Sequence, residues 1–173
     1  MTTPHRIALV GPRAAGKTTV ARALGARLGW PVLDGDDLLA AEVGCPAGDY
    51  LSTAGEAAFR RVEASVTLAV LERPGPWVIA LGGGAVLSAP VRQALSDPST
   101  LVVLLEAPAH CLVERQRADS ARPPLTDLPL EQEVAAVLAE RRSLYETVAD
   151  FRLETFSSNV DACVGAILDK MQP

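Results

Sequence analysis

The stretch Gly11-Pro12-Arg13-Ala14-Ala15-Gly16-Lys17-Thr18-Thr19 decides the fold of this chain. It fits the pattern Gly-x-x-x-x-Gly-Lys-[Ser/Thr], in which glycines let the backbone turn tightly and bring its N–H groups against phosphate oxygens. The helix that follows such a loop presents its N-terminal N–H groups and the positive end of its dipole to the same anion. Lys17 can reach the β- and γ-phosphates of a nucleotide, and the Thr18 hydroxyl can ligate Mg²⁺.

The segments on either side of this loop favour the same interpretation. Residues 6–10 form a short, mostly apolar run, which is typical of a buried strand. After the loop, Val20, Leu24 and Leu28 recur at i, i+4 and i+8, the pattern of an amphipathic helix. The simpler alternative is a glycine-containing turn with a solvated lysine, and the order strand, loop, helix weighs against it.

Composition restricts the class of protein. With 173 residues, of which 49% are hydrophobic, we expect a single domain spanning 1–173 with a sizeable core. A net charge of −5 argues against nucleic-acid binding, and no apolar run approaches the ~20 residues of a membrane span. The first five residues lack a secretion pattern, so we expect a cytoplasmic protein and, in the absence of an extra interface element, a monomer.

Strands and helices alternate in the rest of the predicted chain. Further strands are expected at 31–34, 77–81 and 101–105, with an edge strand at 151–154. Helices are expected at 38–43, from 56 to before Pro74, and at 88–95, 109–117, 130–148 and 160–171. This alternation predicts a three-layer α/β/α fold with a five-stranded parallel sheet. The polar, proline-rich segment 118–129 is the best candidate for a mobile lid.

The helix that begins at Glu56 has its own start signal and its own pattern. The run Thr53-Ala54-Gly55-Glu56 fits a capping box, which is sufficient to explain Glu56. The apolar face of this helix is predicted to carry Phe59, Val62, Val66, Ala69 and Val70.

Polar residues and glycines follow the predicted strands. Asp34 and Asp36 follow the second strand and Gly82-Gly83-Gly84 follow the third, so the parallel sheet brings them to one edge with the phosphate loop. Asp34 can hold Mg²⁺ through water, and Asp36 can accept a hydroxyl proton. The alternatives are a solvated acidic turn, or Asp36 or Asp37 as a helix N-cap, and we expect Asp37 to be a cap or a surface residue. The glycines form either a tight turn or a wall of exposed N–H groups.

Three arginines need an explanation. Arg141 falls in the middle of the apolar stripe of its predicted helix, whereas Arg142 falls at the edge of the stripe. A buried guanidinium needs a partner, which is either an internal carboxylate or a ligand anion. Arg60 lies off the centre of its helix's apolar face and is either a surface residue or a ligand contact. Arg122, in the proline-rich segment, is either solvated or a cation that closes over a transferring phosphoryl group.

Taken together, these motifs resemble the shikimate kinase family, and the resemblance covers nearly the whole chain. The order and spacing of several separate pieces fit that family, which makes the match far more specific than a phosphate loop alone. The matching pieces are residues 11–19, Asp34-Gly35-Asp36, Gly55-Glu56 with Phe59-Arg60, residues 82–86, Arg122-Pro123 with Leu125, and Arg141 before Leu144-Tyr145.

The resemblance implies a sheet of nucleoside-monophosphate-kinase type with a mobile lid, and transfer of the γ-phosphoryl group of ATP to the 3-hydroxyl of shikimate. It implies that Lys17 and Arg122 neutralise the transferring group and that Thr18 and Asp34 serve Mg²⁺. Arg115 corresponds to an arginine that often packs on adenine. By the same resemblance, ATP contacts are expected from Gly11, Ala14, Ala15, Gly16, Lys17, Thr18, Thr19, Arg115 and Arg122.

On the acceptor side, the resemblance implies that Asp36 binds the shikimate hydroxyls and acts as the base. Arg60 and Arg141 are implied to clamp the shikimate carboxylate, and Gly82, Gly83 and Gly84 to line its pocket. A small carboxylate as partner also explains a charge in an apolar stripe, the position that the pattern gives to Arg141.

The chain departs from the family pattern at several positions. Leu51 stands where a phenylalanine is frequent, and Ala40 stands where a glutamate is common. Pro124 adds a second proline to the lid, and residues 154–159 lack the basic residue sometimes found near adenine. These departures bear on affinity and lid motion more than on reaction type, and they leave room for a shikimate analogue.

Two alternatives remain beside this interpretation. One is a kinase of the same fold that acts on another small acceptor, such as a shikimate analogue, gluconate or a nucleotide. The other is a regulatory protein that binds a nucleotide without catalysis. A complete set of residues whose main use is phosphoryl transfer argues against the regulator: Lys17, Thr18, Asp34, Asp36 and Arg122.

Overall fold

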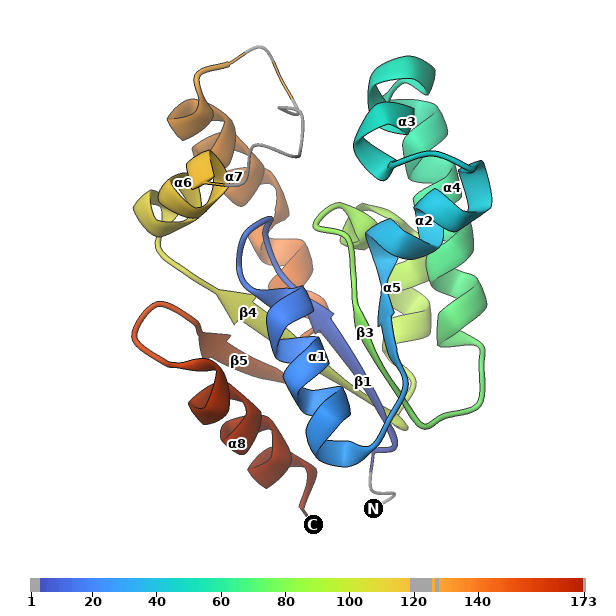
Figure 1. The fold of residues 1–173 in the computed structure, drawn as a ribbon, viewed down its shortest axis with the longest axis vertical. Coiled ribbons are helices and arrows are strands. Elements are labelled where there is room, and N and C mark those ends of the chain that lie inside the picture. The colour runs from blue at the N-terminus through green and yellow to red at the C-terminus, as the bar shows by residue number, and fades with distance from the viewer. Residues whose placement is uncertain (1–3, 119–125, 127, 173) are drawn as a thin grey trace.

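The computed structural model describes residues 4–118, 126 and 128–172, and it confirms the predicted α/β class. Five parallel strands form one sheet in the order β2-β3-β1-β4-β5 (Figure 1). Each predicted strand is confirmed to within one residue at either end. The strands are β1 Arg6–Val10, β2 Val32–Asp34, β3 Trp77–Ala80, β4 Thr100–Glu106 and β5 Phe151–Glu154.

Helices cover both faces of this sheet, which confirms the three layers. In Figure 1, α1 and α8 lie on one face, and α4, α5 and part of α7 lie on the other. The bounds are α1 Lys17–Leu28, α2 Gly35–Val43, α3 Ala47–Ala54, α4 Glu56–Leu71, η1 Ala85–Leu87 (a short 3₁₀ turn), α5 Ala89–Leu95, α6 Ala109–Ala118, α7 Leu130–Val148 and α8 Val160–Met171.

The central strand β1 joins the two halves of the core. Successive side chains on a strand point to opposite faces of the sheet. Ile7 and Leu9 therefore pack with residues of α1 and α8, whereas Ala8 and Val10 pack with residues of α4 and α5. Because β1 is buried on both faces, its sequence is a continuous apolar run after the initial arginine rather than an alternating one.

The region between β2 and α4 differs from the prediction. Helix α2 begins at Gly35, three residues earlier than expected, and the short helix α3 was not predicted. The capping box is wrong, because Thr53 belongs to α3 and its hydroxyl donates to the Asp49 carbonyl at 2.8 Å. The N-cap of α4 is Gly55, with φ +81°, so no side chain caps the first N–H groups of this helix.

The predicted apolar face of α4 is also partly wrong. Phe59 and Val70 are buried as expected, but Val62 and Val66 are only half-buried and Ala69 is exposed. The buried face includes Glu63 and Thr67 instead. A carboxylate can occupy this face because Glu63 is paired with an arginine of its own helix, as described below.

The loops at the carboxyl ends of the parallel strands lie on one edge of the sheet, the upper edge in Figure 1. The phosphate loop follows β1 there, and Gly11 has a φ of +139°. A Cβ on Gly11 would lie 2.2 Å from the Leu105 carbonyl oxygen of β4, so no larger residue fits. The first glycine of the loop is therefore required by the close approach of two strands.

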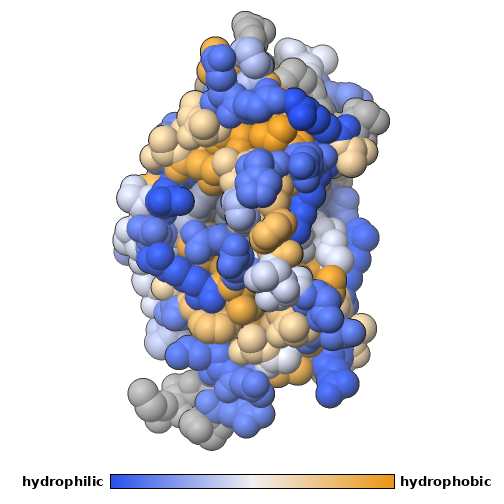
Figure 2. Space-filling model, turned by 90° about the vertical axis from the view of Figure 1, so that its left-hand side faces the viewer, coloured by the Kyte–Doolittle hydropathy of each residue, from blue (hydrophilic) through white to orange (hydrophobic). Residues whose placement is uncertain are grey.

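The flank of the molecule with α6, β5 and α8 is shown in Figure 2, where hydrophobic patches lie among hydrophilic side chains. The edge strand β5 presents Arg152 and Glu154 to solvent, and charged residues on an edge strand discourage pairing with another chain. Of the helices in the described part of the chain, none has the length and apolar character to cross a membrane. The predicted lid residues 119–125 and 127, with Arg122 and Pro124, lie outside the described residues.

Candidate active site

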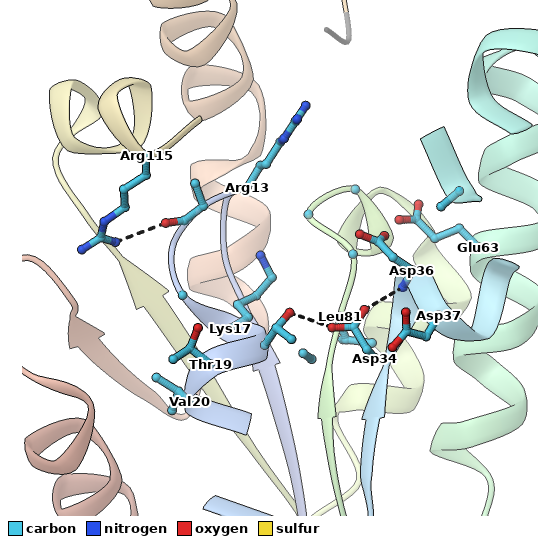
Figure 3. Close-up of a pocket in the computed structure, with 18 of the residues that line it drawn as sticks. Arg13, Lys17, Thr19, Val20, Asp34, Asp36, Asp37, Glu63, Leu81 and Arg115 are labelled. Atoms are coloured by element: carbon cyan, nitrogen blue, oxygen red, sulfur yellow. Dashed lines mark hydrogen bonds between the residues drawn. The ribbon is translucent and has the colours of Figure 1, made fainter. Parts of the chain in front are cut away.

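A large cleft of about 1100 Å³ opens at the carboxyl edge of the sheet. The phosphate loop and the start of α1 form one wall, and α2, α3, α4 and the glycine triplet form the other. Figure 3 shows how charge divides across it: Arg13, Lys17 and Arg115 lie on one side, and Asp34, Asp36, Asp37 and Glu63 on the other. The topology thus brings together residues that are far apart in the sequence.

The phosphate loop is shaped to hold an anion at the N-terminus of α1. Gly16 is the N-cap of α1, with φ +90° and no side-chain cap, so no side chain covers the first N–H groups of the helix. The Lys17 ammonium donates to the carbonyls of Gly11 and Pro12 at 2.9 and 2.8 Å and so folds across the loop. Backbone donors, a helix dipole and a lysine converge here, as phosphate binding requires.

The described residues among those expected to contact ATP divide into two groups. Those that line the cleft are Ala14, Gly16, Lys17, Thr18, Thr19 and Arg115. Gly11 and Ala15 are buried behind the loop and support its backbone. Arg122 lies outside the described residues.

Thr18 and Asp34 meet at the base of the cleft. The Thr18 hydroxyl donates to one carboxylate oxygen of Asp34 at 2.6 Å, and the Asp36 N–H donates to the other at 2.9 Å. Asp34 is therefore the N-cap of α2, a role that the sequence had offered to Asp36 or Asp37. A hydroxyl and a carboxylate side by side are hard oxygen donors of the kind that Mg²⁺ uses together with water and phosphate oxygens.

Glu63 lines the cleft, although the sequence analysis did not single it out. It is 5% exposed and accepts a bond from Arg60 Nη1 at 2.7 Å. Burial raises the pKa of the Glu63 carboxyl above its ordinary value, while the Arg60 guanidinium opposes that shift. A signal existed, because Glu63 is four residues after Phe59 and so falls on the buried face of α4.

Arg60 is held from several sides. Besides Glu63, it pairs with Glu56 at 3.4 Å, and its guanidinium lies 5.2 Å from the centre of the Phe59 ring. Its side chain is 20% exposed and lines the cleft, so Arg60 is not the ordinary surface arginine that the sequence left open. Glu56 contacts this arginine and is not the acid of a capping box.

The glycine triplet packs directly against these charged side chains. A Cβ on Gly82 would lie 2.2 Å from a carboxylate oxygen of Glu63, and a Cβ on Gly84 would lie 2.0 Å from Arg60 Nη1. The carbonyl of Gly83 accepts a hydrogen bond from the buried Tyr145 hydroxyl of α7. The absence of side chains therefore lets an ion pair approach the loop, a reason that neither sequence hypothesis included.

Arg141 lies where its helical stripe predicted. It is 6% exposed and lines the cleft, whereas Arg142 is exposed. Its ion-pair partner among the described residues is the adjacent Glu140, whose side chain is 58% exposed and accepts from Nε at 3.2 Å. Within the described ranges no buried carboxylate forms an ion pair with Arg141. Its guanidinium lies against the Tyr145 hydroxyl, and its positive charge also acts to lower the pKa of the buried Glu63 carboxyl.

Arg115 lies at the nucleotide end of the cleft and contacts the phosphate loop. Its Nη1 donates to the Ala14 carbonyl at 3.1 Å (Figure 3), and its Nη2 donates to the Thr155 carbonyl at 2.8 Å. Two of the positions where the chain departs from the expected pattern, Ala40 and Leu51, line the opposite wall.

Comparisons with known proteins point to one family. The family model described as shikimate kinase matches residues 13–172. The shikimate kinase of Halorhodospira halophila is 38% identical over 170 residues, which cover 98% of this chain and 95% of that protein. Shikimate kinase 2 of Sodalis glossinidius is 39% identical over 168 residues, covering 95% and 94%. The structure of shikimate kinase from Acinetobacter baumannii in complex with shikimate has a TM-score of 0.90 at 35% identity, covering 98% of this chain and 93% of that one.

Proposed function

The chain belongs to the shikimate kinase family, and we propose how its own residues carry out the reaction of that family. The reaction transfers the γ-phosphoryl group of ATP to the 3-hydroxyl of shikimate and gives shikimate 3-phosphate and ADP. It is a step in the biosynthesis of aromatic amino acids. The relatives that match over nearly the full length are named for this activity. A kinase that acts on gluconate, or a regulatory protein without catalysis, is therefore not favoured.

The observation that carries the assignment of roles is a buried guanidinium in the same cleft as the phosphate loop. Arg141 is 6% exposed, and its ion-pair partner in the described part of the chain is an exposed carboxylate. Burying a charge without a well-placed partner is costly. The carboxylate of shikimate supplies that partner, and Arg60 on the facing helix supplies a second cation for it.

Glu63 is a positioning residue in this scheme. Its bond to Arg60 fixes the direction of that guanidinium, and its contact with Gly82 keeps both side chains against the glycine loop. The carboxylate of the acceptor then meets a preformed pair of cations. Preformed groups contribute more to binding than mobile ones, because less side-chain entropy is lost.

Asp36 is the proposed base. It lies in the first turn of α2, across the cleft from Lys17, and lines the same cleft as Arg60 and Arg141 (Figure 3). Its carboxylate accepts the proton of the 3-hydroxyl as the new oxygen–phosphorus bond forms and the bond from the γ-phosphorus to the leaving oxygen of ADP breaks. Lys17 and Arg122 offset the negative charge on the transferring group, and the N–H groups of the loop hold the remaining phosphates.

Thr18 and Asp34 are the proposed protein side of a Mg²⁺ site. Their oxygens are adjacent, and Asp34 is oriented by two hydrogen bonds. When bound with ATP, Mg²⁺ neutralises phosphate charge. The residues present fit that use, since Mg²⁺ commonly takes one or two protein oxygens and fills its remaining positions with water and phosphate.

We further propose that the protein works as a cytoplasmic monomer. Helices cover both faces of the sheet, and charged residues occupy the β5 edge. Sedimentation of the purified protein tests the monomer, because a dimer would double the mass.

The function is tested by ADP release from Mg·ATP with shikimate, quinate, gluconate or no acceptor. We expect release that depends on shikimate and is far weaker with the other compounds. ATP binding without release on shikimate would mean that the acceptor pocket is assigned wrongly, and Ala40 and Leu51 would then be the first positions to reverse. Release without any acceptor would contradict the kinase assignment.

A further inference from the structure

Thr155 follows the last strand and contacts the phosphate loop from behind. It is 8% exposed, and its N–H donates to the Glu106 carbonyl at 2.8 Å, which extends the pairing of β4 with β5. Its hydroxyl oxygen lies 3.0 Å from the Ala15 carbonyl oxygen, 3.2 Å from the Glu106 carbonyl oxygen and 3.2 Å from Arg115 Nη1. A residue 140 positions away in the sequence therefore contacts the loop.

The direction of these bonds follows from the donors available. A threonine hydroxyl has one proton to give and two lone pairs to receive. Arg115 can only donate, so the Thr155 oxygen accepts from it. The Glu106 carbonyl already receives the Thr155 N–H, and the shorter hydroxyl contact is to Ala15. The hydroxyl proton therefore goes to the Ala15 carbonyl.

Two consecutive carbonyls of the phosphate loop are held in this way. Thr155 holds that of Ala15, and Arg115, itself bonded to the Thr155 carbonyl, holds that of Ala14. The C=O and N–H of a trans peptide lie in one plane and point in opposite directions. Holding the Ala15 carbonyl on the far side therefore aims the N–H of Gly16 at the cleft, which Gly16 lines.

The loop needs such support because its backbone is strained. Ala14 has a φ of +65°, a left-handed conformation that is unfavourable for any residue with a Cβ. Strained backbone persists only where the surrounding structure fixes it. The Arg115 bond to the Ala14 carbonyl and the Thr155 bond to the next carbonyl are fixed contacts of this kind.

We propose that Thr155 is a positioning residue which, together with Arg115, holds residues 14–16 in the shape that binds the phosphates of ATP. The inference rests on the phosphate-binding role given to this loop in the proposed function. It also gives Arg115 a second task beside any contact with adenine. Ser158 and Asn159, a few residues after Thr155, line the cleft. The hydrogen bonds of Thr155 and Arg115 therefore connect this part of the cleft wall to the phosphate loop.

The test compares Thr155→Val with Thr155→Ser. Valine keeps the shape and loses the hydroxyl, and serine keeps the hydroxyl. Removing one hydrogen bond and leaving a carbonyl unsatisfied should raise the Kd for ADP and the KM for ATP about five- to tenfold in the valine variant. The KM for shikimate should stay unchanged, and the serine variant should bind ADP almost as the native protein does.

Thr67→Val is the matched control. Thr67 is 1% exposed, and its hydroxyl has no hydrogen-bond partner in the described part of the chain. Losing this hydroxyl should leave ADP binding and both KM values unchanged. If Thr155→Val does not fold by circular dichroism, Thr155→Cys, with a weak donor of similar size, takes its place.

The outcomes separate this inference from the proposed function. Native ADP affinity in Thr155→Val would contradict the positioning role of Thr155. Equal loss in the valine and serine variants would contradict it too, because serine keeps the hydroxyl, and a loss in the serine variant alone would indicate methyl packing. If Thr155→Val lost affinity for shikimate as much as for ADP, the proposal would also be contradicted, because the substitution would then disturb the whole cleft rather than the phosphate loop. If the native protein fails to phosphorylate shikimate, the proposed function fails, while the ADP titrations still decide the role of Thr155.

Discussion

Two buried arginines occupy opposite edges of the sheet, and their surroundings differ. Arg6 begins β1 at the amino edge, is 8% exposed, and donates to the Leu71 carbonyl at 2.9 Å. It also pairs with Asp97 at 2.8 Å and lies 5.7 Å from the centre of the Trp77 ring. Arg141, at the carboxyl edge, is buried to the same degree but lines the cleft and pairs with an exposed neighbour.

The comparison indicates what distinguishes a structural charge from a binding charge. Arg6 takes a backbone carbonyl, a carboxylate and an aromatic face from its own chain, so its burial is compensated when the protein folds. Arg141 directs a cation into a cleft that also contains a phosphate loop. We therefore expect changes at the carboxyl edge to affect turnover and changes at the amino edge to affect stability.

The largest effect is expected from Lys17→Ala. Removing the cation that faces the transferring group should lower kcat by about a thousandfold, in the range seen when one transition-state partner is lost. The midpoint of thermal unfolding should change little, because Lys17 is only partly buried and contacts carbonyls of its own loop. Steady-state ADP release and a thermal melt measure the two quantities.

The other lysine of the chain provides the control. Lys170 is exposed near the end of α8, and Lys170→Ala should leave both turnover and stability unchanged. If Lys17→Ala kept near-native turnover, the phosphate-loop assignment would be wrong.

The two arginines also show how far the sequence could predict this molecule. Each is a charge in an apolar pattern, Arg6 in a strand and Arg141 in a helical stripe, and both are buried. The apolar pattern predicts the burial of both residues correctly, because the face on which a residue lies follows from the local periodicity of its strand or helix. It does not identify partners, since Arg6 bonds to Leu71, 65 positions away. The sheet, most helices and the position of the cleft follow from periodicity and motifs in the same way.

What the sequence could not give depends on tertiary contacts. Helix α3 has only eight residues and none of them is buried, so it is too short to show a repeating apolar pattern. For Glu63, helical spacing from Phe59 could indicate the buried face, but the contact of its carboxylate with Gly82 could not be predicted. The role of Thr155 is likewise invisible, because its hydroxyl meets a loop at the other end of the chain.

The next largest effect is expected from Arg141→Ala. Losing a charged partner of the acceptor carboxylate should raise the KM for shikimate about ten- to a hundredfold, while the KM for ATP stays within about twofold. Arg142→Ala is the control, because Arg142 is the next residue and is exposed. An unchanged KM for shikimate in Arg141→Ala would place Arg141 with Arg6, as a structural arginine.

A smaller effect is expected from Tyr145→Phe, which tests a contact between α7 and the acceptor loop. The hydroxyl donates to the Gly83 carbonyl, and burial raises the pKa of Tyr145 to about 12, so it remains a donor at neutral pH. Losing this bond should raise the KM for shikimate about fivefold. Tyr50→Phe should have no such effect. Equal KM values for both variants would mean that the hydroxyl does not position the glycine loop.

The smallest effect is expected at the amino edge, from the pH dependence of Asp97→Asn. Hydrogen bonds from Ser99, assisted by Arg6, lower the pKa of the Asp97 carboxyl from 3.8 to about 2. A lowered folded-state pKa gives stability that is present above the unfolded value and is lost as the pH falls. The midpoint of thermal unfolding should therefore be slightly higher for the native protein than for Asp97→Asn near neutral pH, and this gap should close between about pH 3.8 and pH 2.

Asp169→Asn, at an exposed site on α8, is the control and should show no such closing gap. A gap that stays constant with pH would mean that the Asp97 charge does not stabilise this edge, and that Arg6 is held by Leu71, Ser99 and Trp77 without it.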